Sequence, residues 1–79
     1  MQVKIITPEK ILFEGVANYV QVCGSQGEFG VLPNHAPFIS TLKEGVIGVE
    51  IAGASKQEFV VKGGVAEVLP ESVTLLVEA

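Results

Sequence analysis

VAEVLPESVTLLVEA, residues 65–79, places two strand-like runs, VAEVL and SVTLLVEA, on either side of a Pro-Glu dipeptide. Val73, Leu75 and Val77 share one parity, and a β-strand sends residues of one parity to one face. A proline between two such runs favours a turn, so the stretch predicts a β-hairpin. Leu76 lies on the otherwise polar parity. It therefore indicates a second face that is either buried or covered by a partner.

The middle of the chain repeats this arrangement. GVIGVEIAG (45–53) and KQEFVVKGG (56–64) are apolar, β-branched runs that flank AGAS (52–55). Gly53 supplies any positive φ that a tight turn there requires. We expect a second hairpin.

The N-terminal part also consists of short strand-like segments. QVKII (2–6) alternates, TPEK (7–10) is a turn in which proline presets φ, and ILF (11–13) is a short second strand. VANYVQV (16–22) is expected to be one continuous strand, because three of its valines share a parity. These are Val16, Val20 and Val22.

No segment keeps a helical apolar period for the ten or so residues that a helix needs. Residues 1–79 are therefore expected to form a single all-β domain. Many short strands separated by frequent turns are typical of a flattened sandwich or small barrel, here of about ten strands.

The composition narrows the possible partners. Apolar residues make up 48% of the 79 residues, and the mean hydropathy is +0.49, so a domain this small is expected to expose apolar contact surface. No apolar run approaches the roughly 18 residues of a membrane span, which predicts a soluble intracellular or peripheral protein.

Five lysines, no arginine and a net charge of -4 argue against nucleic acid as a partner. A single cysteine agrees with a reducing compartment.

GSQGEFGVLPNHAPFIS, residues 24–40, reads as a long loop that displays apolar side chains. Its glycines turn the chain and its prolines stiffen it. Glu28 sits at a turn tip, where its carboxylate is free to meet a cation. The apolar side chains of the run are those of Phe29, Val31, Leu32, Phe38 and Ile39. If they packed into the protein's own core instead, no partner would be needed.

The same run carries little chemistry. Its G-x-x-G-x-x-G spacing is neither the dinucleotide fingerprint nor a phosphate loop. Cys23 and His35 could form a thiolate–imidazole pair, but no oxyanion-hole signature accompanies them, and Cys23 also reads as a packed apolar residue. One histidine, one cysteine and scattered glutamates supply no metal-ligand spacing, and no aspartate is present for a carboxylate pair. We predict a protein without catalytic, cofactor or metal sites. His35 is either a solvent-facing loop histidine or an interface residue.

Three segments together resemble a known family. TPEKILFEG (7–15), VQVCGSQGEFGVLPNHAPFISTLKEGVI (20–47) and GGVAEVLPESVTLLVEA (63–79) are similar, in order and spacing, to the N-terminal domain of the epsilon subunit of F-type ATP synthases. The resemblance implies a β-sandwich at the foot of the central rotor stalk. Such a domain binds the gamma subunit, rests on the ring of c subunits, and helps couple proton-driven rotation to ATP synthesis without catalysing it.

The resemblance also implies site residues and a location. Typical members continue into a two-helix C-terminal domain, to which nothing in these 79 residues corresponds. The protein would lie peripherally at the cytoplasmic face of the energy-coupling inner membrane. One group of residues would face the c subunits: Ser25, Glu28 and Phe29. A second group would lie towards gamma: Thr7, His35, Phe38 and Ser40.

Two other functions fit a small β domain. One is a small stand-alone β carrier or ligand-binding module. A lipoyl or biotinyl carrier displays its acceptor lysine at a hairpin tip, but neither Lys43 nor Lys56 has that sequence context. A cysteine enzyme would require a reactive Cys23.

Overall fold

The computed structural model describes residues 1–54 and 56–79. Within these residues every regular element is a strand, as the sequence predicts, and the strands number nine rather than about ten. They are β1 (Gln2–Ile6), β2 (Ile11–Val16), β3 (Tyr19–Gly24), β4 (Gly27–Val31), β5 (Phe38–Leu42), β6 (Gly45–Glu50), β7 (Gln57–Val61), β8 (Gly63–Val68) and β9 (Ser72–Glu78).

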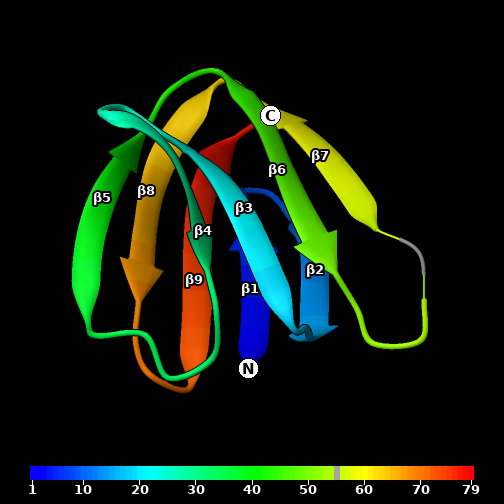
Figure 1. Cartoon of the computed structure of the whole chain (residues 1–79). Coiled ribbons are helices and arrows are strands. Elements are labelled where there is room, and N and C mark those ends of the chain that lie inside the picture. The colour runs from blue at the N-terminus through cyan, green and yellow to red at the C-terminus, as the bar shows by residue number, and fades with distance from the viewer. Residues whose placement is uncertain (55) are drawn as a thin grey trace.

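All nine strands belong to one sheet that curls over into two layers (Figure 1). One layer has the strand order β2-β1-β9-β8-β5, and the other consists of β4, β3, β6 and β7. The layers join through the register pair Gly24↔Leu42, between β3 and β5. β1 runs parallel to β9, and all other pairs are antiparallel. The predicted all-β sandwich is confirmed.

Both predicted hairpins form. β8 and β9 pair from Val68↔Val73 outward, and β6 pairs with β7 from Gly45↔Val61 to Val49↔Gln57. Ser55, in the predicted turn of the second hairpin, lies outside the described residues.

The predicted TPEK turn joins β1 to β2. Thr7 Oγ1 accepts hydrogen bonds from the backbone N–H groups of Glu9 and Lys10, at 3.2 and 3.1 Å. It also donates to the Lys10 carbonyl, at 3.2 Å. The hydroxyl thereby holds the turn closed, which is the role that threonine commonly has in turns.

The core lies between the two layers and is made almost entirely of β-branched side chains and leucine. Val3, Ile5, Leu75 and Ile47 are among the buried residues, and no polar or charged residue is buried among those described. Two aromatic pairs close the open sides of the sandwich. Phe13 and Phe59 join β2 to β7, and Phe29 and Phe38 join β4 to β5.

The prediction of one strand from Val16 to Val22 is wrong. Val16 ends β2 and is exposed, and β3 begins at Tyr19. Between them the chain passes from one layer to the other: Ala17 N–H donates to the Met1 carbonyl in the first layer, at 2.9 Å, and Asn18 N–H to the Glu50 carbonyl in the second, at 2.8 Å. Valine parity did not reveal this crossing because parity reports a face and not a layer.

The described residues contain no helix of the length and apolar character needed to cross a membrane.

Candidate partner-binding surface

Residues 24–40 are mostly strand, which corrects the prediction of a long loop. β4 takes up 27–31 and β5 begins at Phe38, so the irregular part is confined to the turn at 25–26 and the loop at 32–37. Gly27 opens β4 at φ 134°, a value that favours glycine. β4 is paired on one side by β3, and β5 is paired mainly by β8. The two strands therefore face each other across one open side of the sandwich.

An aromatic cluster fills this side. The Phe29 and Phe38 ring centroids are 5.2 Å apart at an interplanar angle of 57°, and the His35 ring lies 5.0 Å from that of Phe38 at 54°. These tilted arrangements are favourable for aromatic pairs. Phe29 and Phe38 are half-buried against the core. The cluster therefore stabilises the fold with one face and presents the other to solvent.

The 32–37 loop holds His35 over Phe38. Asn34 adopts a left-handed φ of 68°, which asparagine tolerates, and its N–H donates to the Pro70 carbonyl at 2.8 Å. The His35 ring donates from Nδ1 to the Ala36 carbonyl at 2.8 Å. A loop anchored in this way presents its histidine in a defined position.

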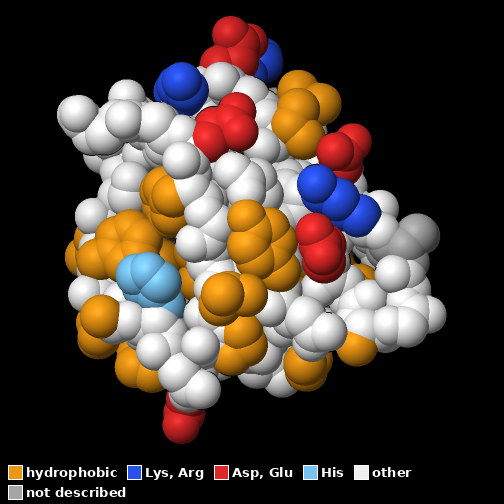
Figure 2. Space-filling view, in the orientation of Figure 1, with side chains coloured by type: hydrophobic (Ala, Val, Ile, Leu, Met, Phe, Trp, Pro, Cys, Tyr) orange, Lys and Arg blue, Asp and Glu red, His pale blue; other side chains and the backbone are white. Residues whose placement is uncertain are grey.

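The cluster is the centre of a wider apolar surface. Figure 2 shows hydrophobic side chains gathered around the histidine over β4 and β5, with most lysine and glutamate side chains away from it. Leu32 is 60% exposed and Ile39 is 71% exposed. Val31, predicted to be displayed, is instead fully buried. Val31 and Phe29 point to the same, inward face of β4. At Val31, the C-terminal end of the strand, the core covers this face completely.

Glu28 lies beside this cluster and belongs to a polar row on the outer face of β3 and β4. Tyr19 OH donates to Gln21 Oε1, and Gln21 Nε2 donates to Glu28 Oε1 at 3.5 Å. The only ion pair among residues 1–54 and 56–79 joins Lys4 to Glu14, so no described lysine neutralises Glu28. The sequence analysis missed Tyr19 and Gln21. Tyr19 and Gln21 are two residues apart, so the sequence could have placed both on one face of the strand.

The remaining predicted residues do not all join the cluster. Ser25 is in the β3–β4 turn, where its Oγ accepts a hydrogen bond from Thr41 Oγ1 at 2.9 Å. Ser40 is half-buried and donates to the Thr41 carbonyl at 3.0 Å. Figure 1 places the turns that contain Thr7 and Ser25 at the end of the sandwich where the C-terminus lies, and the 32–37 loop at the other end. The structure thus unites Phe29, His35 and Phe38 and leaves Thr7 and Ser25 apart from them.

Cys23 is a packing residue in this structure. It is buried, and its Sγ donates to the Lys43 carbonyl at 3.2 Å. Burial raises the pKa of the Cys23 thiol, and the negative charge of Glu28 acts in the same direction. A neutral, inaccessible thiol is a poor nucleophile.

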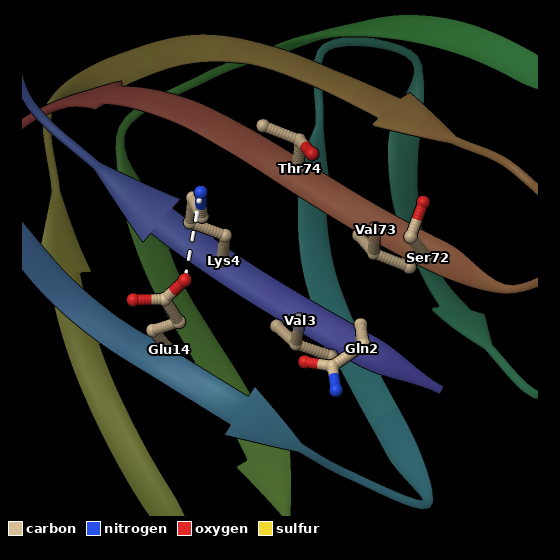
Figure 3. A pocket seen from close by; sticks show the side chains of 7 residues that line it. All are labelled: Gln2, Val3, Lys4, Glu14, Ser72, Val73 and Thr74. Atoms are coloured by element: carbon tan, nitrogen blue, oxygen red, sulfur yellow. Dashed lines mark ion pairs between the residues drawn. The ribbon is translucent and has the colours of Figure 1, made fainter.

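The described part of the chain offers neither a metal-ligand cluster nor, in the hollow beside Lys4, a ligand site. No group of three or more histidine, cysteine or acidic side chains there is close enough to hold a metal ion. A hollow of about 280 Å³ lies on the outer face of β1, β2 and β9 (Figure 3). Its charged groups, Lys4 and Glu14, pair with each other at 3.5 Å and are about half exposed. Such a hollow lacks the buried, convergent polar groups of a ligand site.

Sequence comparison identifies relatives along the whole chain. The family model described as ATP synthase, Delta/Epsilon chain, beta-sandwich domain matches residues 1–79. An ATP synthase epsilon chain of Caulobacter vibrioides is 47% identical over 74 residues, which are 94% of this chain and 85% of that protein. One of Parvibaculum lavamentivorans is 45% identical over 74 residues, again 94% of this chain, but the match spans only 56% of that protein.

Structural comparison gives the same architecture. A chain in the mitochondrial ATP synthase of Euglena gracilis, solved as the OSCP/F1/c-ring assembly, superposes with a TM-score of 0.90 at 23% identity. The match covers 98% of this chain and 49% of that one. At this identity the likeness supports the fold.

Proposed function

The chain belongs to the family of β-sandwich domains found in the delta and epsilon chains of ATP synthase, and we propose that it acts as a rotor subunit of the central stalk. In this role it binds the gamma subunit and contacts the c-ring, and it transmits rotation without catalysing a reaction. The observation that carries the proposal is the family match over all 79 residues, together with a surface suited to docking.

The aromatic cluster is our candidate for the gamma contact. Interface anchors are typically aromatic side chains that are rigid before binding, since little conformational entropy is then lost. Phe38 is held by Phe29 on one side and by His35 on the other. Exposed Leu32 extends the apolar area beside it, and exposed Ile39 lies next to Phe38 in the chain, on the outer face of β5. Ser40 would contribute at the edge of such an interface, and the turn at Thr7, at the other end of the sandwich, would contact gamma separately.

Glu28 is our candidate for the c-ring contact. Its carboxylate is exposed and has no described cationic partner, so a basic group on a c-subunit loop would find an unpaired charge. Ser25 lies in the turn that precedes β4, and Phe29 follows Glu28 within β4. Because a rim charge is screened by salt, this contact should set orientation more than total affinity.

The location follows from the same proposal. As part of a membrane-bound ATP synthase, the subunit would lie peripherally at the cytoplasmic face of the energy-coupling membrane, held there by gamma and the c-ring.

Gel filtration of the chain with purified gamma subunit and c-ring tests the proposal. We expect co-elution of all three, and we expect Glu28→Gln to weaken retention of the c-ring at low salt while gamma stays bound. Glu58→Gln, an exposed carboxylate on the β7 edge, is the matched control. A folded chain that elutes alone would overturn the proposal.

A further inference from the structure

Gly30 makes room for the Tyr19 ring on the outer face of β4. Its φ is not positive, so the backbone does not require glycine at this position. A Cβ there would lie 2.5 Å from Tyr19 Cζ and closer still to the Tyr19 hydroxyl. Glycine inside a strand costs stability and is found where another group approaches the backbone closely. Here that group is the phenol ring, which reaches from β3 across Gly30.

This ring position brings the Tyr19 hydroxyl to Gln21. Tyr19 OH donates to Gln21 Oε1, and Gln21 Nε2 donates to Glu28 Oε1 at 3.5 Å. A carboxylate only accepts hydrogen bonds, so the Gln21 amide turns its NH2 group to Glu28 and its oxygen to the tyrosine. The three groups form a chain with one direction, from hydroxyl to amide to carboxylate. In such a chain each hydrogen bond polarises the next.

The strand register explains why these side chains meet. Gln21 pairs with Gly30, and Cys23 pairs with Glu28. Gln21 and Glu28 are therefore diagonal neighbours on the outer face of β3 and β4, and long side chains reach across such a diagonal. On β6 the register partner of Gln21 is Gly48. Because the residue opposite Gln21 is glycine on both neighbouring strands, no β-carbon stands directly beside its side chain.

A competing partner for Glu28 lies at the end of the same strand. Lys43 N–H donates to the Cys23 carbonyl, and Cys23 is the register partner of Glu28, so strand pairing brings Lys43 close to Glu28. The two side chains form no ion pair within residues 1–54 and 56–79. The hydrogen bond from Gln21 draws the Glu28 carboxylate towards the middle of β3, away from Lys43. The carboxylate thus stays available to a cation from outside.

We propose that Tyr19 and Gln21 are positioning residues for Glu28, which keep its carboxylate free of Lys43 and so set its affinity for a cationic side chain of a c subunit. This assignment rests on the proposed function, in which Glu28 meets the c-ring. Neither positioning residue needs to touch the partner, since each acts through the carboxylate. Gly30 belongs to the same arrangement, because it lets the tyrosine ring reach Gln21.

Affinity of the gamma-bound chain for purified c-ring, measured with and without the Glu28 carboxylate, tests the assignment. We expect Gln21→Leu to weaken c-ring binding several-fold at low salt, because Glu28 can then pair with Lys43. In the Glu28→Gln background the same substitution should have no further effect. Equal weakening in both backgrounds, or no weakening in the chain that retains Glu28, would overturn the positioning role alone. Unchanged affinity in Glu28→Gln itself would overturn the proposed c-ring contact as well.

A pair of glycine substitutions tests the arrangement without removing a polar group. Gly30→Ala should displace the Tyr19 hydroxyl from Gln21 and weaken c-ring binding as Gln21→Leu does. Gly48→Ala is the matched control, since it flanks Gln21 on the other side and its Cβ would crowd only the Lys56 side chain, 2.5 Å from Cε. It should leave the affinity within twofold, and equal effects of the two substitutions would contradict the proposal. If Gly30→Ala folds poorly, Tyr19→Phe removes only the hydroxyl and should have the same effect.

Removal of the competing lysine gives an independent readout. Lys43→Gln added to Gln21→Leu should restore most of the c-ring affinity, because Glu28 then has no lysine beside it to pair with. The same substitution should change the affinity less when Gln21 is intact. An equal gain in both backgrounds would mean that Lys43 acts only through net charge, and it would refute the claim that Gln21 keeps Glu28 away from this lysine.

Discussion

Phe38 has two roles because of where its ring lies. It is half-buried, and it packs on Phe29 from the facing strand, which closes one side of the sandwich. The same ring supports His35 on the solvent side. Phe59 has only the first of these roles, since it closes the other side against Phe13. The two phenylalanines are therefore a natural pair for separating stability from binding.

We predict that Phe38→Ala weakens gamma binding by about 1–3 kcal/mol, the usual cost of removing an interface anchor. Both rings are partly buried, so Phe59→Ala and Phe38→Ala should lower the free energy of unfolding by similar amounts. Phe59→Ala should leave the affinity for gamma unchanged. Urea unfolding and a binding titration on both variants check this. Loss of stability without loss of affinity in Phe38→Ala would place its ring in the core alone.

Cys23 should make stability fall at alkaline pH. Burial is the main reason that the pKa of its thiol rises above the ordinary value of 9.0. Above pH 9 the unfolded chain therefore loses this proton while the folded chain retains it, so the free energy of unfolding decreases as pH rises towards the folded pKa. Below the unfolded pKa of about 9.0 the contribution is fully present.

The variant Cys23→Ala lacks this proton and should show a shallower alkaline decline. Urea titrations at several pH values between about 8 and 10 compare the two slopes. Identical slopes would mean that the thiol is as accessible in the folded chain as in the unfolded one. Slow alkylation of the folded wild type would agree with the same burial.

Among the strands, the sequence pattern predicted both hairpins but not which distant strands pair with each other. Side-chain parity in the C-terminal run assigns Val73, Leu75 and Val77 to one face, and the hairpin within 45–64 follows from two β-branched runs on either side of a turn that contains Gly53. Parity carries no information on which distant strand comes next, so the parallel pairing of β1 with β9 was not predictable. The crossing at 17–18 was missed for the same reason.

The candidate site was also only partly predictable. Apolar residues in 24–40 indicated a display surface, and Phe29, His35 and Phe38 do meet there. The buried Val31 and the separated Ser25 and Thr7 depend on how two layers face each other, which is a long-range property. The exposed apolar residues on the outer face of β8, β9, β1 and β2 were indicated by Leu76 alone, because the others come from three more strands.

Gly64 marks a point where two strands approach closely. Its φ is +149°, and a Cβ there would lie 2.9 Å from Val77 Cα and closer still to the Leu76 carbonyl oxygen. We predict that Gly64→Ala lowers the free energy of unfolding by about 2–4 kcal/mol, from backbone strain and a clash that β9 cannot avoid.

Gly53→Ala is the control for this change. Gly53 also has a positive φ, +73°, but no atom of the described residues lies within 4 Å of the Cβ that would be added. Only the conformational cost of about 1 kcal/mol should remain. Equal effects of the two substitutions in urea unfolding would show that the close approach of β8 and β9 costs nothing.

The whole molecule carries more apolar surface than so small a core can absorb. Its Cα radius of gyration is 11.1 Å, and its extents are 28 × 24 × 19 Å, so nearly every strand has one face near solvent. The aromatic cluster closes one open side of this thin sandwich, and exposed Leu76 and Ile11 lie on the outer face of the five-stranded layer. A domain with two such surfaces is suited to being held between partners, as a rotor subunit is.

A calorimetric titration of the chain into purified gamma subunit tests the central claim most directly. We predict saturable one-to-one binding that is strongly weakened in Phe29→Ala, Phe38→Ala and retained in Phe59→Ala. Absence of binding by a chain shown to be folded would contradict the claim that this domain is a gamma-bound subunit of the rotor.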